Sequence, residues 1–583
     1  MVILKQYKMR YPIFQFAYLP LLVICLLFGC KERLPDNNGE FSEQIRLNQV
    51  GYYPFATKKA VIVNGEGLKE FSLVDNETQE IVFSGPLTET KEWKLAGEQI
   101  QVADFTGMNT SGDYSIYIEG LGYSYPFKVG DHVMHDAFIG SIKAMYYQRA
   151  GMALEEKYAG KWKREMGHPD DSVVFHPSSG KNEGYISSTK GWYDAGDYNK
   201  YVVNGSFPLG QFYTLYEQYP GIITDGGLNI PESGNGVSDL LDELKYEMDW
   251  LLTMQDDDGG LYHKLTTKNF EGIVMPDKAT SQRFIVGKGT AASLDFAACA
   301  AQAYRVFKDI EPTYADQCLT AAKKAYHWAV ENPNIEFLNP DDISTGQYGD
   351  KNFEEEWFWA NAELFIATRE ANYLDGINKN PLNFEFAKGD NWAKFMKFSG
   401  MFSLLENKDD IPENLYKALK TGIGKRADAL VKKAGGLDYF QPIDDFQWGS
   451  NSDVLNAAMI MAQAYRLNSK PEYLRGVQQC ADYIFGTNAT GYSFVTGYGD
   501  KYPMNIHHRQ SASDEIVEPV PGFVCGGPNF GKQDAASGVV YPDNAPPMKS
   551  WVDQEPSYAS NEICLNWNAP LTYILGFLDQ ESK

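Results

Sequence analysis

The hydrophobic pattern of the chain changes its period near residue 130, and this change constrains the fold more than any other feature. Between residues 45 and 129, polar and apolar residues alternate in short runs such as "KKAVIVNG" and "DYSIYIEG". Alternation with a period of two is typical of strands that bury one face. From residue 135 onward, apolar residues recur every three or four positions, which is the helical period. A chain of 583 residues is too long for one ordinary domain, so we predict two.

Residues 43–130 are predicted to form a small all-β sandwich of immunoglobulin type, because the strand-like runs recur about every ten residues between Gly, Asn and Asp. Residues 135–580 are predicted to be all-α, with about ten to twelve helices and no strand pairs between them. Long loops rich in Gly, Pro and aromatic residues separate these helices, and such loops usually carry function. We therefore expect an α/α toroid or barrel with an active surface at one end. The loops cover residues 160–200, 335–355, 435–452 and 488–560.

Residues 1–30 carry three basic residues, then an apolar run from 16 to 29, then Cys30. About 14 apolar residues cannot cross a bilayer that needs about 20, so this segment is predicted to be a signal peptide. "LLFGC" resembles a bacterial lipobox, in which Cys30 carries the lipid. The bulky Phe28 keeps a plain secretory signal as the alternative. We expect an exported lipoprotein of the bacterial outer membrane, on its periplasmic or cell-surface face, bound to the membrane only through this anchor.

Composition excludes several classes of partner. The chain has 77 acidic and 52 basic residues, a net charge of -25, which argues against nucleic acid and anionic membrane surfaces. Aromatic residues make up 14% of the chain, a surplus that suits a groove for a neutral ligand. We expect a monomer. The remaining cysteines contain no CxxC pair, so neither a disulfide framework nor a thiolate zinc site is predicted. They are Cys299, Cys318, Cys480, Cys525 and Cys564.

The stretch "GWYDAGDYNKY", residues 191–201, places Asp194 and Asp197 three positions apart among aromatic and glycine residues. Asp and Gly are common in tight turns, so one interpretation is a solvated turn. The other interpretation is a pair of acids held over a sugar or another polar substrate, with aromatic rings available to stack on it. Both interpretations stay open on this stretch alone.

"GWYDAGDYNKYVV" closely resembles the signature of family 9 glycoside hydrolases, and further stretches resemble blocks of that family in the same order. Residues 45–54 are similar to the opening of the immunoglobulin-like domain that precedes the catalytic domain in one large subgroup. The resemblance covers nearly the whole chain after the signal peptide. The other blocks include "WGSNSDVLNAA" (448–458), "SFVTGYGDKYPMNIHHR" (493–509) and "WVDQEPSYASNEICLNWNAPL" (551–571).

This resemblance implies an (α/α)6 barrel that hydrolyses β-1,4-glucosidic bonds with inversion. Inversion needs an acid and a base whose carboxyl groups lie roughly 6.5 to 9.5 Å apart, with room for water between them. By the resemblance, Asp197 is the base, Asp194 helps to hold the water, and Glu562 is the acid. Asp553 also falls on an active-site position of the family, with an orienting role. A structural cap for Asp194, and a merely dipole-favoured place at a helix start for Glu562, are the alternatives.

The resemblance gives His507 and Arg509 hydrogen bonds to substrate near the cleaved bond, while His508 is either a binding or a structural residue. Several aromatic residues are expected to stack on glucosyl rings, and at least two of them to line the cleft, with core packing as the alternative for each. They are Trp359, Trp448, Tyr502, Trp551 and Tyr558. Cys564 departs from the family pattern, which has Ala, Ser or Thr at this position.

No cofactor is expected to be required. Some members of the family bind zinc just before the signature through two Cys and two His, but this chain has His168 and His176 there and no Cys. Zinc is therefore not expected. A structural calcium ion is an open alternative, because Asp350 and the three acids at 354–356, Glu354, Glu355 and Glu356, supply hard oxygen ligands. A solvated acidic face explains these residues equally well.

The sequence thus predicts a glycoside hydrolase, most simply an endo-β-1,4-glucanase acting on cellulose-like glucans, xyloglucan or cello-oligosaccharides. An exo-acting glucosidase or glucosaminidase of the same family, and a non-catalytic surface glycan-binding lipoprotein, are the alternatives. The joint presence of Asp194, Asp197 and Glu562 favours the enzyme, because a binding protein does not need all three. The loops at 160–190 and 335–355 are expected to decide between endo and exo action.

Overall fold

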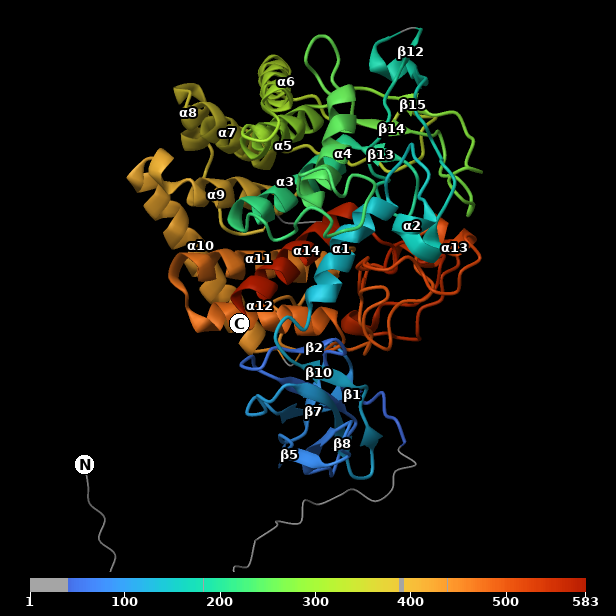
Figure 1. The fold of residues 1–583 in the computed structure, drawn as a ribbon, viewed down its shortest axis with the longest axis vertical. Coiled ribbons are helices and arrows are strands. Elements are labelled where there is room, and N and C mark those ends of the chain that lie inside the picture. The colour runs from blue at the N-terminus through green and yellow to red at the C-terminus, as the bar shows by residue number, and fades with distance from the viewer. Residues whose placement is uncertain (1–39, 182, 387–392, 438, 583) are drawn as a thin grey trace, which may run out of the picture.

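The computed structural model describes residues 40–181, 183–386, 393–437 and 439–582 (Figure 1). The predicted signal peptide and Cys30 lie outside these residues. A small β-domain sits against one side of a larger helical domain, as the sequence pattern predicts (Figure 1). No helix within the described ranges is both long enough and apolar enough to cross a membrane.

The β-domain is a sandwich of two sheets. Its strand β3 shows why alternation builds such a fold: Ala60 and Ile62 face the core between the sheets, whereas Val61 and Val63 join the core of the helical domain. One sheet has the order β1 (Ile45–Arg46), β3 (Lys59–Val63), β7 (Glu98–Asp104) and β6 (Lys91–Trp93). The other has the order β2 (Gly51–Tyr52), β10 (Phe127–Val129), β8 (Gly112–Ile118), β4 (Glu70–Asp75) and β5 (Ile81–Pro86), with β9 (Gly122–Tyr123) beside β8.

A buried carboxylate ties the two domains together. The side chain of Glu98, 2% exposed, pairs with Arg46 NH2 at 2.8 Å and with Lys549 Nζ at 2.6 Å. It also accepts a hydrogen bond of 2.8 Å from the hydroxyl of Tyr439 in the helical domain. Beside it, the side-chain oxygen of Gln49 accepts hydrogen bonds from the main chain of residues 500 and 501. The β-domain is therefore packed onto the helical domain by shared apolar core and by buried charge.

Twelve helices of nine residues or more, among the described residues, alternate between an inner and an outer ring. Helix α5 buries 16 of its 18 residues, many of them Ala, whereas α10 buries 7 of its 23 on one face only. An inner helix is expected to be buried on all sides, whereas an outer helix is expected to have a single apolar stripe. The inner ring consists of α3 (Val202–Gln218), α5 (Thr290–Phe307), α7 (Glu354–Thr368), α9 (Met396–Glu406), α11 (Ser450–Asn468) and α14 (Leu565–Glu581). The outer ring consists of α1 (His135–Tyr147), α4 (Asp239–Thr253), α6 (Pro312–Glu331), α8 (Ala371–Lys379), α10 (Glu413–Gly435) and α12 (Pro471–Ile484).

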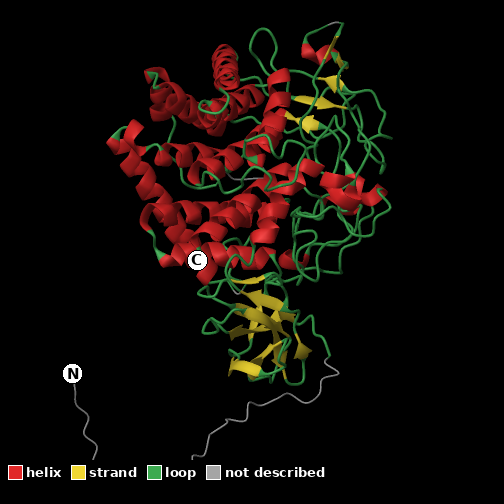
Figure 2. Cartoon of the chain, in the orientation of Figure 1, coloured by secondary structure: helices red, strands yellow, loops and turns green. Residues whose placement is uncertain are grey.

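The long loops gather at one side of the helical domain, and a short sheet lies among them (Figure 2). This sheet corrects the prediction that the helical domain lacks strand pairs. Its strands have only two or three residues, too few to show a period, and they pair across long separations: Lys200 lies opposite Leu265. The sheet has the order β12 (Tyr185–Ile186), β11 (Val173–Phe175), β15 (Phe284–Ile285), β14 (Lys264–Thr266) and β13 (Lys200–Tyr201).

Candidate active site

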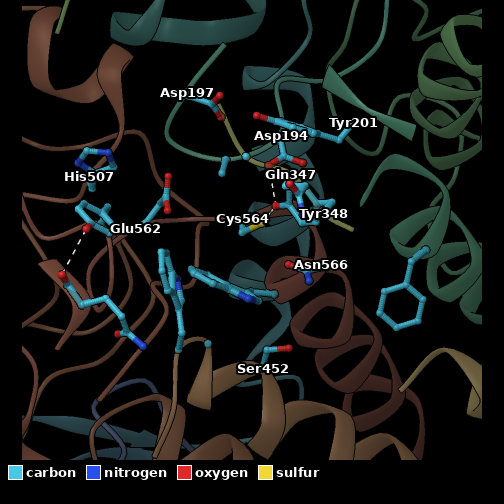
Figure 3. Close-up of a pocket in the computed structure, with 18 of the residues that line it drawn as sticks. Asp194, Asp197, Tyr201, Gln347, Tyr348, Ser452, His507, Glu562, Cys564 and Asn566 are labelled. Carbon is cyan, nitrogen blue, oxygen red and sulfur yellow. Dashed lines mark hydrogen bonds between the residues drawn. The ribbon is translucent and has the colours of Figure 1, made fainter. Parts of the chain in front are cut away.

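A cavity of about 790 Å³ lies where the inner helices begin. Asp194, Asp197, His507 and Glu562 face the same space in it, and Arg509 also lines it (Figure 3). Most of the lining comes from the segments just before α3, α7, α9, α11 and α14. Because the N-terminal end of a helix carries partial positive charge, this arrangement favours carboxylates in the cavity.

Asp194 is buried, and both of its carboxylate oxygens accept hydrogen bonds. Asn204 Nδ2 donates to Oδ1 at 2.7 Å, and the hydroxyl of Tyr348 donates to Oδ2 at 2.8 Å. Burial raises the pKa of Asp194 well above its ordinary value, and the neighbouring charge of Asp197 adds to the rise. Cys564, the residue that departs from the family pattern, lies beside it and accepts from Asn204 Nδ2 at 3.2 Å. Sequence reasoning did not identify Asn204 or Tyr348, because neither lies in a spacing that signals a partner for Asp194.

Asp197 is held by Asn199, two residues later. The side-chain amide of Asn199 donates to Asp197 Oδ2. The side-chain oxygen of Asn199 in turn accepts from the backbone N of Thr267 at 2.9 Å and from Thr266 Oγ1 at 3.1 Å. The short sheet thus fixes Asn199, and Asn199 fixes the carboxylate. This second partner was also missed, because β14 was not predicted.

Glu562 lies against the loop of the two aspartates. The backbone N of Gly196 donates to Glu562 Oε1 at 3.3 Å. At Gly196 a Cβ atom would overlap the carbonyl oxygen of His507, so only glycine allows the chains to approach this closely. Burial raises the pKa of Glu562 to about 7, although the charge of His507 opposes the rise and that of Asp197 adds to it. Glu562 is therefore a carboxyl group that can hold a proton near neutral pH.

His507 and Arg509 lie next to the contact between Glu562 and the aspartate loop. His507 Nδ1 lies 2.7 Å from the carbonyl oxygen of Glu555. Burial alone lowers the pKa of His507, but the hydrogen bond to Glu555 and the charge of Glu562 together raise it above its ordinary value. Arg509 NH1 donates to the carbonyl oxygen of Gly196 at 2.9 Å. Arg509 therefore steadies the aspartate loop as well as lining the cavity.

Two of the predicted stacking residues line the cavity, Trp448 and Tyr558. The side chain of Trp448 is 39% exposed, and its ring centroid lies 5.5 Å from that of Tyr558. Phe270, which is 48% exposed, and Trp567 also line the cavity. Sequence reasoning assigned no sugar contact to either, because a single Phe in a loop and a Trp on a buried helix show no pattern that separates cavity from core.

The structure corrects the other stacking predictions. Trp359 is 0% exposed and donates from Nε1 to Glu363 Oε1 at 3.1 Å within the helical core. Trp551 packs against Tyr492, with ring centroids 4.6 Å apart, instead of lining the cavity. Tyr502 is likewise absent from the cavity lining. Trp359 and Trp551 are therefore core residues, as the alternative interpretation predicts.

Two further predicted residues lie behind the cavity wall. His508 is buried, with Nδ1 2.9 Å from Ser511 Oγ, so its place is structural. Asp553 does not line the cavity; its carboxylate accepts from the backbone N of Met504 at 2.9 Å and of Asn505 at 2.8 Å. This position behind the cavity wall is compatible with the predicted orienting role, which stays a prediction.

Zinc is not expected near His168 and His176, and calcium near residues 350–356 is an open alternative. Glu354 Oε1 pairs with Lys397 Nζ at 2.9 Å. His168 Nδ1 lies 2.8 Å from the hydroxyl of Tyr193, whereas His176 Nε2 lies 3.1 Å from Asp342 Oδ1. Across the described part of the chain, no group of three His, Cys, Asp or Glu side chains is arranged to hold a metal ion.

Comparison with known proteins assigns this chain to one family. Residues 135–575 match the family described as Glycosyl hydrolase family 9, and residues 40–123 match the Cellulase N-terminal ig-like domain. The chain belongs to glycosyl hydrolase family 9. It is a glycoside hydrolase that cleaves β-1,4-glucosidic bonds, and this chemistry needs no cofactor.

Its relatives in the family include a xyloglucan-specific endo-beta-1,4-glucanase, BoGH9A of Bacteroides ovatus, 40% identical over 561 residues that cover 92% of this chain and 94% of the relative. Endoglucanase D of Acetivibrio thermocellus is 34% identical over 553 residues, covering 94% of this chain and 85% of the relative. A solved structure described as Bacteroides ovatus GH9 superposes with a TM-score of 0.85 at 37% identity, covering 93% of this chain and all of that one. The (α/α)6 barrel is thus the fold of this glycosyl hydrolase.

Trp448→Ala is expected to weaken binding of a soluble β-glucan about tenfold, because an exposed ring on the cavity wall offers a stacking surface. Trp359→Phe is the matched control: it is expected to lower the free energy of unfolding by about 1 to 3 kcal/mol and leave glucan affinity unchanged. Affinity electrophoresis and denaturant unfolding measure the two quantities. Unchanged glucan affinity in Trp448→Ala would contradict the assignment of Trp448 as a stacking surface in the cavity.

Proposed function

We propose that this glycosyl hydrolase is an endo-acting, inverting β-1,4-glucanase whose preferred substrate is xyloglucan. The observation that carries the chemical part is the contrast between carboxyl groups in one cavity. Glu562 can hold a proton near neutral pH, and Asp197 lines the same cavity with the side-chain amide of Asn199 donating to its carboxylate. The xyloglucan-specific relative, aligned over 94% of its length, supports the substrate. Exposed rings of Trp448 and Phe270 on the cavity lining support the binding of a long chain.

In this proposal Glu562 gives its proton to the glycosidic oxygen as the bond from that oxygen to the anomeric carbon breaks. Water attacks the same carbon from the opposite face, and Asp197 accepts the proton that the water loses. Asn204 and Tyr348 fix the carboxylate of Asp194 at the cavity wall, and each of its oxygens can accept a further hydrogen bond, so we assign Asp194 the part of holding the water. Each turnover leaves Glu562 ionised and Asp197 protonated, and exchange with solvent restores both.

Glu562→Gln is expected to reduce the turnover of a glucan by about 10²- to 10⁴-fold and to spare much of the rate on an activated aryl glycoside, whose leaving group needs no proton. Asp197→Ala is expected to be severe on both substrates, because both need activated water. Initial rates and the anomeric configuration of the first product, followed by NMR, measure these effects. Release of a β-configured reducing end by the wild-type enzyme would refute inversion.

The dependence of rate on pH supplies the control. Since Glu562 acts protonated and its pKa is raised to about 7, kcat/KM on a glucan is expected to fall as pH rises through about 7. Glu562→Gln should lose this basic limb in its residual activity on the same glucan. A limb that persists unchanged in the variant belongs to another group.

Product lengths distinguish endo from exo action. On xyloglucan we expect a rapid fall in viscosity and a spread of long products early in the reaction, with slower cleavage of cellulose and mixed-linkage glucan. Size-exclusion chromatography over time measures the lengths. Release of one short product from the start would indicate exo action, and faster cleavage of unbranched cellulose would overturn the substrate.

We also propose that the protein is exported as a lipoprotein and acts as a monomer at the outer membrane. Cys30→Ala is expected to move the protein from the membrane fraction to the soluble fraction without changing its specific activity, as immunoblotting of fractions would measure. Unchanged membrane association of the variant would count against the lipobox. A structural calcium ion near residues 350–356 stays a prediction from composition alone.

A further inference from the structure

The segment that carries Asp197 is held on two sides. On one side, the side chain of Asn199 joins Asp197 to Thr267 of the adjacent sheet segment. Tyr198 and Lys200, which flank Asn199, are held by contacts with a different part of the chain. Both lead to one buried carboxylate, Asp170, in the loop before the signature motif.

Asp170 draws two cations to this segment. Its side chain is 2% exposed, with Oδ2 2.8 Å from Lys200 Nζ and Oδ1 3.0 Å from Arg283 Nε. Arg283 NH1 then donates to the carbonyl oxygen of Tyr198 at 2.6 Å. Lys200 Nζ also donates to the carbonyl oxygen of Lys190 at 2.7 Å, just before the signature motif. One carboxylate thus anchors the main chain on both sides of Asn199.

The charges in this cluster depend on one another. Lys200 is fully buried, and burial lowers its pKa to about 8 although Asp170 opposes the shift. Without the carboxylate, Lys200 and Arg283 would be two buried like charges without their shared partner, and removing one partner of a buried ion pair is costly. Loss of Asp170 would therefore release Lys200 or Arg283 from its present place.

We infer that Asp170 is a positioning residue for the proposed base: through Lys200 and Arg283 it sets the main-chain position of residues 198–200 and hence of the Asp197 carboxylate. The inference rests on the proposed role of Asp197. Asp170 itself does not line the cavity. Its effect reaches the reacting water only by way of the segment 197–200.

This role separates turnover from binding. Attack by water needs the base within a hydrogen bond of it, and a displacement of about 1 Å can reduce a rate by as much as 10²-fold. The surfaces available for stacking on the glucan, Trp448 and Tyr558, come from other segments of the chain. A disturbed Asp170 therefore lowers kcat and leaves KM nearly unchanged.

The test is the variant Asp170→Asn in the otherwise intact chain. Its activity on xyloglucan is measured below the melting temperature of the variant protein. We expect kcat to fall about 10- to 100-fold with KM within about twofold. Glu98→Gln is the matched control, because Glu98 is also a 2% exposed carboxylate with two cationic partners, Arg46 and Lys549, but at the domain interface. It is expected to lower the melting temperature while kcat stays within about twofold of wild type.

A second readout follows the segment itself. Hydrogen exchange of the amides of residues 194–201 should be faster in Asp170→Asn than in wild type and unchanged in Glu98→Gln. If Asp170→Asn does not fold, Arg283→Lys carries the test. Lysine keeps the charge but has one nitrogen, so it cannot contact both Asp170 and the carbonyl oxygen of Tyr198 as Arg283 does. The same split between kcat and KM, with a smaller loss of kcat, is expected.

Two outcomes would overturn the inference: a kcat in the folded variant within about twofold of that of Glu98→Gln, or equal losses in 1/KM and kcat. Asp197→Ala on the same substrate separates this failure from failure of the proposed function. If Asp197→Ala is inactive while Asp170→Asn is not impaired, the base assignment stands and the positioning role falls. If Asp197→Ala retains most of its activity, the base assignment itself falls.

Discussion

The main chain of Ala195 and Gly196 lies directly against two segments that are more than 300 residues away in sequence. Ala195 forms a bridge with Cys564, Gly196 N donates to Glu562, and Arg509 N donates to the carbonyl oxygen of Gly196. Because a side chain at Gly196 would overlap the main chain of His507, the contact depends on glycine. This approach brings the carboxyl groups of Asp194, Asp197 and Glu562 into one cavity.

The barrel supplies the frame for this contact. Asp194 and Asp197 stand just before α3, and Glu562 stands just before α14, two inner helices that pack side by side. Their N-terminal ends therefore open toward the same space, and their partial positive charge favours acids there. Small residues along α5 let the inner helices pack closely, so the positions of the loops at their ends are set by a rigid ring.

The three carboxyl groups of the cavity have different surroundings. Glu562 lies half-buried in the cavity wall and accepts from the backbone N of Gly196, and desolvation raises its pKa to about 7. Asp194 receives two side-chain donors, and Asp197 receives the amide of Asn199. Behind Asn199 stand the short sheet on one side and the ion pairs of Asp170 on the other. The function of the cavity thus extends to residues that never meet the substrate.

The sequence by itself determined the two-domain plan, because alternation and helical periodicity are local and survive in a one-dimensional pattern. It also determined which acids to examine, since the motifs around Asp194, Asp197 and Glu562 are contiguous. Only the tertiary structure decided that Trp448 lines the cavity while Trp359 belongs to the core, because both are Trp residues in family blocks. It alone revealed the short sheet and the partners Tyr348 and Asn204. These depend on contacts between residues tens to hundreds of positions apart, and no local pattern encodes such contacts.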